Sequence, residues 1–240
     1  MPPDDRRALQ LDERIRALGL GAPVALRLSA RARRLSLRID PAARAVELVL
    51  PPRFAAETAI GFVAAHRGWI AARLEALPPP LRLAEGATVP VFGAPHVIRR
   101  AFGGGAPVVA IGDGEIRVRG DPAHVPRRVR DHLRALARRE LAARARIAAA
   151  RIGRSVARVG VRDPKSRWGS CSSTGALSFS WRLVFAPEAV IDYVVAHEVA
   201  HLIEMNHGPR FWRLVASLVR DIDQPRAWLR RHRNELLSYT

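Results

Sequence analysis

Residues 193–208 read YVVAHEVAHLIEMNHG and contain the pattern H-E-x-x-H from His197 to His201. The apolar lead-in predicts a buried helix, and residues four apart lie one above the other on a helix face. Both imidazoles can therefore reach one metal ion, and Glu198 can reach a water bound to that ion. The stretch predicts a metal site built on a helix.

A third histidine, His207, follows the predicted end of this helix in a turn that contains glycine. Catalytic zinc needs three protein ligands and an open fourth position, and His207 can complete that set with His197 and His201. Zinc held by neutral imidazoles lowers the pKa of a bound water to roughly 7, and Glu198 can then act as the general base. The alternative, a group of satisfied core histidines, explains this spacing less well.

The residues before and after the site predict strands and helices. Alternating apolar residues predict strands over 156–161 and 177–183. The second strand would run beside the cleft, where it could pair with an extended peptide. Pro187 stands where a helix would start. Helical spacing continues over 209–219 and again from 228 to 236.

The first half of the chain is mainly β in pattern. Three short alternating runs predict an antiparallel meander, and two longer segments predict a second β region; the five segments are 24–28, 35–39, 46–50, 81–99 and 107–119. Helices are predicted over 55–77 and 125–152. The second of these is rich in arginine, and its apolar side includes Val129, Leu133 and Ile147.

The chain is strongly basic, with 40 Lys and Arg against 22 Asp and Glu and a formal charge of +18. Such a charge suits a nucleic-acid partner. The arginines are, however, scattered from Arg6 to Arg233, and Lys165 is the only lysine. This usage is typical of a GC-rich coding sequence, so the charge alone is weak support for nucleic-acid association.

The composition also indicates the compartment. No uncharged apolar run approaches the ~20 residues of a membrane helix, and the polar start of the sequence is unlike a signal peptide. Cys171 is the only cysteine, which excludes an intramolecular disulfide. We expect a cytoplasmic protein with no membrane association.

Further motifs accompany the histidine-containing stretch. They are Ser166-Arg167-Trp168-Gly169-Ser170-Cys171-Ser172, Trp181-Arg182-Leu183, Asn206-His207, Phe211-Trp212 and, upstream, Arg33-Arg34-Leu35-Ser36-Leu37-Arg38, Trp69-Ile70 and Phe92-Gly93. In this order they resemble the YgjP-like metallopeptidase family, which is related to the SprT-like and WLM zincins. The resemblance extends from about residue 22 to residue 235 and is far more specific than H-E-x-x-H alone.

The resemblance implies an α+β fold, with a β-rich N-terminal region followed by a minimal zincin-like (SprT-like) metallopeptidase domain that carries the H-E-x-x-H helix. We expect an N-terminal tail over 1–21, a β-rich region with one helix over 22–121, and the zincin-like domain over 122–240.

The resemblance also implies the site. Zinc is expected at His197, His201 and His207, with Glu198 as the catalytic residue. All four match the family pattern, whereas Val199 replaces its usual leucine. The main expectation is a zinc metallopeptidase that acts on a peptide or protein substrate.

Two alternatives stay open. Hydrolysis of nucleoside triphosphates has been attached to one member of the family, so a nucleotide is the alternative substrate. A nucleic-acid-associated module with structural zinc is the other.

Four more residues are candidates for a role at the site. Arg167 and Ser180 are candidate substrate-binding residues, although Ser180 stands where the family often has asparagine. Cys171 is either a fourth metal ligand or a buried structural thiol. Tyr193 either stabilises an oxyanion or packs in the core.

Overall fold

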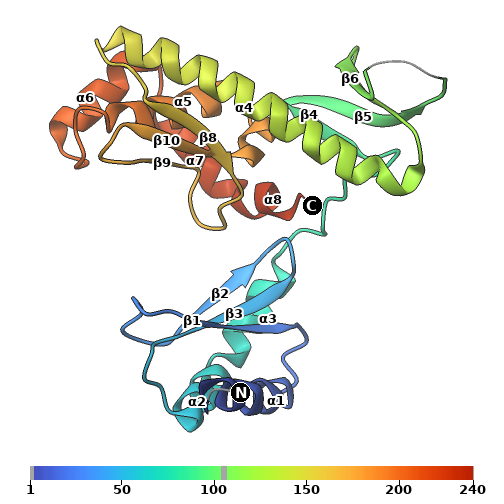
Figure 1. The fold of residues 1–240 in the computed structure, drawn as a ribbon, viewed down its shortest axis with the longest axis vertical. Helices are drawn as coiled ribbons and strands as arrows, with labels where there is room; N and C mark the ends of the chain where they lie inside the picture. Colours follow the sequence, from blue (N-terminus) through green and yellow to red (C-terminus); the bar gives the residue numbers. More distant parts are fainter. Residues whose placement is uncertain (1–2, 104–106, 240) are drawn as a thin grey trace. The chain divides into compact units, whose positions relative to one another are not determined.

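The computed structural model describes residues 3–103 and 107–239, and the chain divides into two compact units, Met1–Pro80 and Leu81–Thr240 (Figure 1). The sequence predicts a boundary at residue 121 instead. The division falls earlier because the second predicted β region packs on the long helix of the second unit and shares its core.

The first unit combines helices with one small sheet. Its elements are α1 (Pro3–Arg16), β1 (Val24–Leu28), β2 (Ser36–Asp40), β3 (Ala45–Leu50), α2 (Ala56–Ala65) and α3 (Arg67–Glu75). The predicted N-terminal tail is largely helix α1, which contributes the buried side chains of Leu11 and Ile15 to the core. The single predicted helix over 55–77 is two helices, interrupted at His66.

The sheet of the first unit has the order β1-β3-β2. Strand β3 lies in the centre, parallel to β1 and antiparallel to β2. The predicted antiparallel meander is therefore wrong. The physical reason is the burial of Val46, Leu48 and Leu50, because the most apolar strand takes the position that is covered on both edges.

The second unit contains two sheets and the C-terminal helices. Its elements are β4 (Thr88–Val91), β5 (Ala94–Ala101), β6 (Val109–Gly112), β7 (Glu115–Arg119), α4 (Val125–Arg151), β8 (Arg158–Arg162), β9 (Gly169–Cys171), β10 (Ala176–Ser180), α5 (Glu188–Ala200), α6 (Pro209–Leu218), α7 (Asp223–Arg231) and α8 (Arg233–Ser238), with 3-10 helices at Pro122–His124 and Trp181–Phe185. The mixture of helices and small sheets confirms the predicted α+β class.

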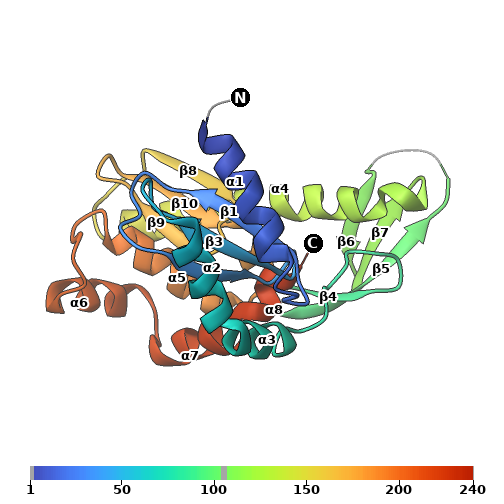
Figure 2. The same cartoon turned by 90° about the horizontal axis from the view of Figure 1, so that it is seen from below.

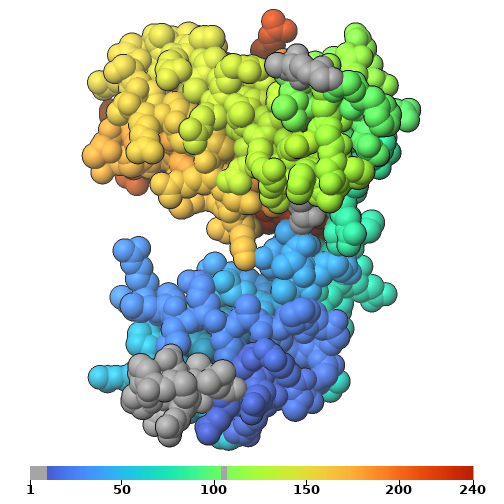
Figure 3. All heavy atoms as spheres, turned by 45° about the vertical axis from the view of Figure 1, so that its right-hand side comes forward, coloured from blue at the N-terminus to red at the C-terminus, as the bar shows by residue number. Residues whose placement is uncertain are grey.

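Helix α4 connects the two sheets of this unit (Figures 1 and 2). It contacts β6 and β7 near its N-terminus and β8 and α5 further along, and Figure 3 shows its surface between that of β8 and that of the β5–β7 sheet. Val129 and Leu133 are buried as predicted, but Ile147 is 65% exposed. None of the described helices has the length and apolar character needed to cross a membrane.

The sheet beside the site has the order β8-β10-β9. Strand β10 pairs with β8 on one edge and with β9 on the other. The predicted pairing of this strand with a peptide is therefore wrong, because neither of its edges is free. The strand also ends at Ser180, before the predicted residue 183, since Trp181–Phe185 turn into a 3-10 helix.

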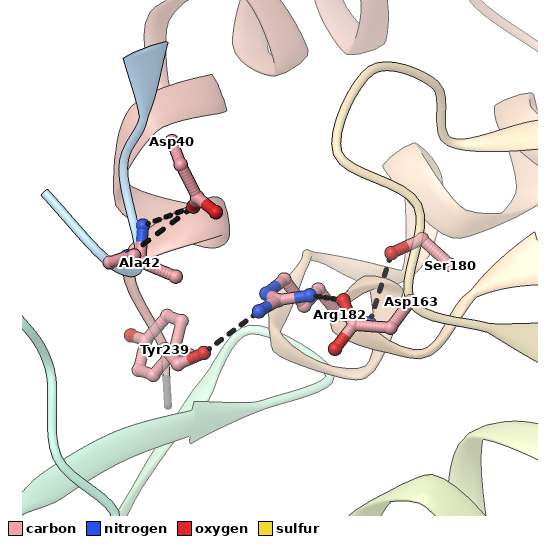
Figure 4. A network of polar contacts seen from close by, with 7 residues as sticks. Asp40, Ala42, Asp163, Ser180, Arg182 and Tyr239 are labelled. Carbon is pink, nitrogen blue, oxygen red and sulfur yellow. Dashed lines mark hydrogen bonds and ion pairs between the residues drawn. The ribbon is translucent and has the colours of Figure 1, made fainter. Parts of the chain in front are cut away.

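A buried arginine joins this 3-10 helix to the C-terminus (Figure 4). Arg182 is 6% exposed; its Nη1 contacts the Asp163 carboxylate, and its Nη2 donates to the Tyr239 carbonyl oxygen at 3.1 Å. A buried guanidinium needs such partners. The hydrogen bond to Tyr239 therefore holds the end of α8 against the 3-10 helix that precedes α5.

The β4–β5 turn, Phe92-Gly93, fixes the start of α5. Both residues have positive φ, and the Phe92 amide donates to the Val184 carbonyl oxygen at 2.7 Å. A Cβ on Gly93 would lie 3.0 Å from the Cα of Pro187. The turn is therefore tightly packed against Pro187, the residue before α5.

We expect Gly93→Ala to destabilise the protein more than Gly86→Ala. Both glycines have φ near +80° (+84° and +82°), but nothing lies within 4 Å of a Cβ at Gly86. Gly86→Ala should carry only the backbone strain of about 1 kcal/mol. Gly93→Ala should lower the free energy of unfolding by about 1 kcal/mol more, as measured by urea denaturation. Equal losses would contradict the packing of this turn on Pro187.

Candidate metal centre

Helix α5 carries the H-E-x-x-H pattern through the core of the second unit. It packs against α4 and also against α6, α7 and β9. As the apolar lead-in predicts, most of its side chains are buried, including Val190, Ile191, Val194, Val195 and Val199. The helix ends at Ala200, and the turn that begins at His201 leads to α6. This turn brings His207 back to the end of α5.

The three histidines form one cluster. His197, His201 and His207 each offer a ring nitrogen, and these atoms all lie within 4.8 Å of one another. The Nε2 atoms of His197 and His207 are 3.0 Å apart. Two nitrogens bound to one tetrahedral zinc ion lie about 3.3 Å apart, so the donor set fits a single metal ion.

The orientation of His201 is set by a backbone group. Its Nδ1 lies 3.0 Å from the Glu204 carbonyl oxygen. If Nδ1 carries the proton and donates it there, Nε2 is left with a free lone pair for a metal, as is usual for histidine ligands. The contact is made by the backbone of Glu204 and not by its side chain. The Phe211 ring closes the other side, with centroids 4.6 Å from His201 and 4.9 Å from His197.

The surroundings of His197 and His201 lower their pKa values and so favour the neutral imidazole, which is the form that binds a metal. Burial, reinforced by His201 and His207 and then by Arg226, lowers the pKa of His197 to about 4. Burial also lowers the pKa of His201. Metals bind the neutral imidazole, so both side chains are ready for a metal at neutral pH.

Glu198 lies beside the histidines with little access to solvent. Its residue is 6% exposed, and burial raises the pKa of its carboxyl to about 7, against the lowering effect of Arg167. A Cβ built on Gly169 of strand β9 would lie 2.5 Å from the Cγ and Oε1 of Glu198. Because glycine has no side chain, the backbone of β9 can approach the Glu198 carboxylate closely.

A pocket of about 450 Å³ opens in front of this site. His197, Glu198, Gly169, Tyr193 and the candidate substrate-binding residue Arg167 are among its lining residues. The structure thus brings Arg167 to the site, and Tyr193, which is buried, also reaches it.

Ser180 does not reach the pocket. It is 0% exposed, and its Oγ accepts a hydrogen bond from the Arg182 amide, so it caps the 3-10 helix (Figure 4). The structure therefore argues against the predicted role of Ser180 in substrate binding.

Cys171 lies outside the histidine cluster. Its Sγ donates to the Ser172 carbonyl oxygen at 3.3 Å. Burial, together with the charge of Glu198, raises the pKa of the thiol. Because metals bind the thiolate, a raised pKa disfavours Cys171 as a ligand.

Metal-dependent hydrolases with the H-E-x-x-H motif have this arrangement, in which imidazoles gather beside a glutamate carried by the same helix. The family model described as YgjP-like, metallopeptidase domain matches residues 33–232. The chain therefore belongs to the YgjP-like metallopeptidase family, as the motifs predict. No curated protein and no solved structure matches the chain significantly.

The cluster predicts that the purified protein binds about one zinc ion per chain. Replacing His197, His201 or His207 by alanine removes one of three ligands and should weaken zinc binding more than about 100-fold. His124→Ala changes an exposed histidine outside the cluster and should leave zinc binding unchanged. Elemental analysis and zinc titration measure both. Full zinc binding by any of the three cluster variants would contradict this ligand set.

Proposed function

We propose that this protein is a zinc-dependent peptidase in which His197, His201 and His207 hold the zinc ion and Glu198 is the general base. The observation that carries the proposal is the histidine cluster beside a buried carboxylate, with His197 and Glu198 both lining one pocket. Zinc is the proposed metal because three imidazoles are its typical ligands in catalytic sites, whereas calcium and magnesium prefer oxygen ligands. The proposed compartment is the cytoplasm.

When bound, zinc would supply Lewis acidity, which makes a water more acidic and polarises the carbonyl group of the substrate. The carboxylate of Glu198 takes the proton of the attacking water and then donates it to the leaving amine. A pKa of about 7 suits both roles near neutral pH. Gly169 restricts the carboxylate on one side, so the base is positioned before the substrate arrives.

Strand β9 offers a place for a peptide. Among the described strands it pairs only with β10, so its other edge is open. Gly169 of β9 also lines the pocket that contains Glu198. An extended peptide could add to this edge through main-chain hydrogen bonds and so reach the site. The peptide would therefore pair with β9 and not with β10.

The second candidate function is hydrolysis of a nucleoside triphosphate at the same site. The observation that favours it is Arg167, whose guanidinium lines the pocket and suits a phosphate. Nucleic-acid association has less support. On α4, Arg127 pairs with Asp131, as expected for a solvated face, and Arg144 pairs with Asp192 of α5.

Glu198→Gln should keep the metal and lose activity. Glutamine cannot take the proton from water, so hydrolysis of a peptide library by the zinc-loaded protein should fall by about 10²- to 10⁴-fold. Zinc content, measured on the same sample, should equal that of the wild type. Activity that persists in wild-type protein stripped of metal, or in the zinc-loaded Glu198→Gln variant, would refute the proposed function.

Gly169→Ala should displace the carboxylate of Glu198 and leave the three histidines unchanged. The added methyl group meets Glu198 at 2.5 Å, and a displacement of about 1 Å in a catalytic group can reduce activity about 100-fold. Gly160→Ala is the matched control, because it lies on β8 of the same sheet and its Cβ meets only the Leu177 carbonyl oxygen, at 3.9 Å. Zinc affinity should be unchanged in both variants. Wild-type activity in Gly169→Ala would show that the contact does not position Glu198.

A further inference from the structure

The pocket in front of Glu198 is strongly basic. Arg167, Arg226, Arg230 and Arg233 line it, and Glu198 is the one acidic residue among its described lining residues. The pocket measures about 450 Å³. A ligand of that size therefore lies close to several guanidinium groups.

The basic composition of the chain does not by itself account for this imbalance. A larger pocket of about 890 Å³ elsewhere in the second unit combines Arg151, Arg220 and Arg231 with the acids Asp192 and Asp221. Two acids offset three arginines there, whereas one acid faces four arginines in the pocket that contains Glu198. The excess of positive charge is thus a local property of the pocket that contains Glu198.

Three of the four arginines form a row. Arg226 and Arg230 are on α7, and Arg233 opens α8. Arg226 and Arg230 are four residues apart on α7, so their side chains lie on the same face of that helix, about 5–6 Å apart, and Arg233 follows at the start of the next helix. In an extended peptide, the side chains of residues two apart lie on the same face, about 7 Å from each other. Neighbouring arginines of the row can therefore bind two such side chains.

Acids of the protein neutralise little of this charge. Arg226 has an ion pair with Asp223 at 3.8 Å, but the Asp223 side chain is 94% exposed, and such pairs contribute little. The Nη2 atom of Arg233 lies 3.4 Å from the Lys165 carbonyl oxygen, which leaves its charge uncompensated. The Arg226 guanidinium also lies over the Trp212 ring, 5.0 Å from its centroid, which restricts its position.

We propose that the site selects acidic peptides, whose aspartate or glutamate side chains near the scissile bond bind to the row formed by Arg226, Arg230 and Arg233. The inference rests on the proposed peptidase function and gives it a substrate class. Guanidinium groups bind carboxylates through two parallel hydrogen bonds, so the row offers geometry as well as charge.

The first experiment measures turnover of matched peptides by the zinc-loaded protein. Each pair has one sequence, with Asp and Glu in one member and Asn and Gln in the other. We expect kcat/KM to be about tenfold higher for the acidic member, as for a hydrogen bond to a charged group. Arg226→Gln combined with Arg230→Gln should remove this preference. Arg146→Gln, on the exposed face of α4, should keep it.

The second experiment measures binding without turnover. Zinc-loaded Glu198→Gln is titrated with the same fluorescent peptide pairs at several salt concentrations. The acidic member should bind about tenfold more tightly, and salt should reduce the difference. Adding Arg226→Gln and Arg230→Gln should equalise the two affinities. Thermal unfolding of each variant checks that the fold is retained.

The outcomes separate this inference from the proposed function. Equal turnover and equal binding of both members would overturn the selection of acidic peptides and leave the peptidase proposal standing. Hydrolysis of no peptide, with nucleoside triphosphates hydrolysed in a Glu198-dependent manner, would overturn the proposed function. Tighter binding of the acidic member that is unaffected by the arginine substitutions would overturn the role of the row.

Discussion

The close approach of strand β9 to helix α5 is the constraint on which the site depends. Gly169 leaves no room for a methyl group beside Glu198, so the strand backbone and the carboxylate are neighbours. This approach buries the carboxylate and thereby raises its pKa to about 7. It also places Gly169 of β9, an edge strand of its sheet, at the pocket.

The rest of the second unit holds α5 in the position that this contact requires. The Phe92-Gly93 turn packs on Pro187 before the helix starts, and Arg182 joins the preceding 3-10 helix to Asp163 and to the C-terminus. After the helix ends, a short turn carries His207 back to the histidines of α5. The three histidines thus come from one helix and the turn that follows it, whereas segments distant in sequence hold that helix in place.

The sequence predicts the histidine cluster well because its geometry is local. Residues four apart on a helix must share a face, and His207 follows only a few residues later. Strand pairing depends on contacts between distant residues, so the central positions of β3 and β10 could not be predicted from alternation alone. Alternation also does not reveal which polar residue caps a turn, so the capping role of Ser180 could not be predicted from the sequence. The sequence analysis does not single out Arg226, Arg230 and Arg233, because only the structure places α7 and the start of α8 at the pocket.

Anomalous diffraction at the zinc edge from crystals of the zinc-loaded protein tests the central claim most directly. The account predicts one strong peak about 2.0–2.1 Å from a ring nitrogen of each of His197, His201 and His207. It also predicts a fourth coordination position that is open toward Glu198 and free of Cys171. A peak at another place, or a site closed by a fourth protein ligand, would contradict a catalytic metal centre.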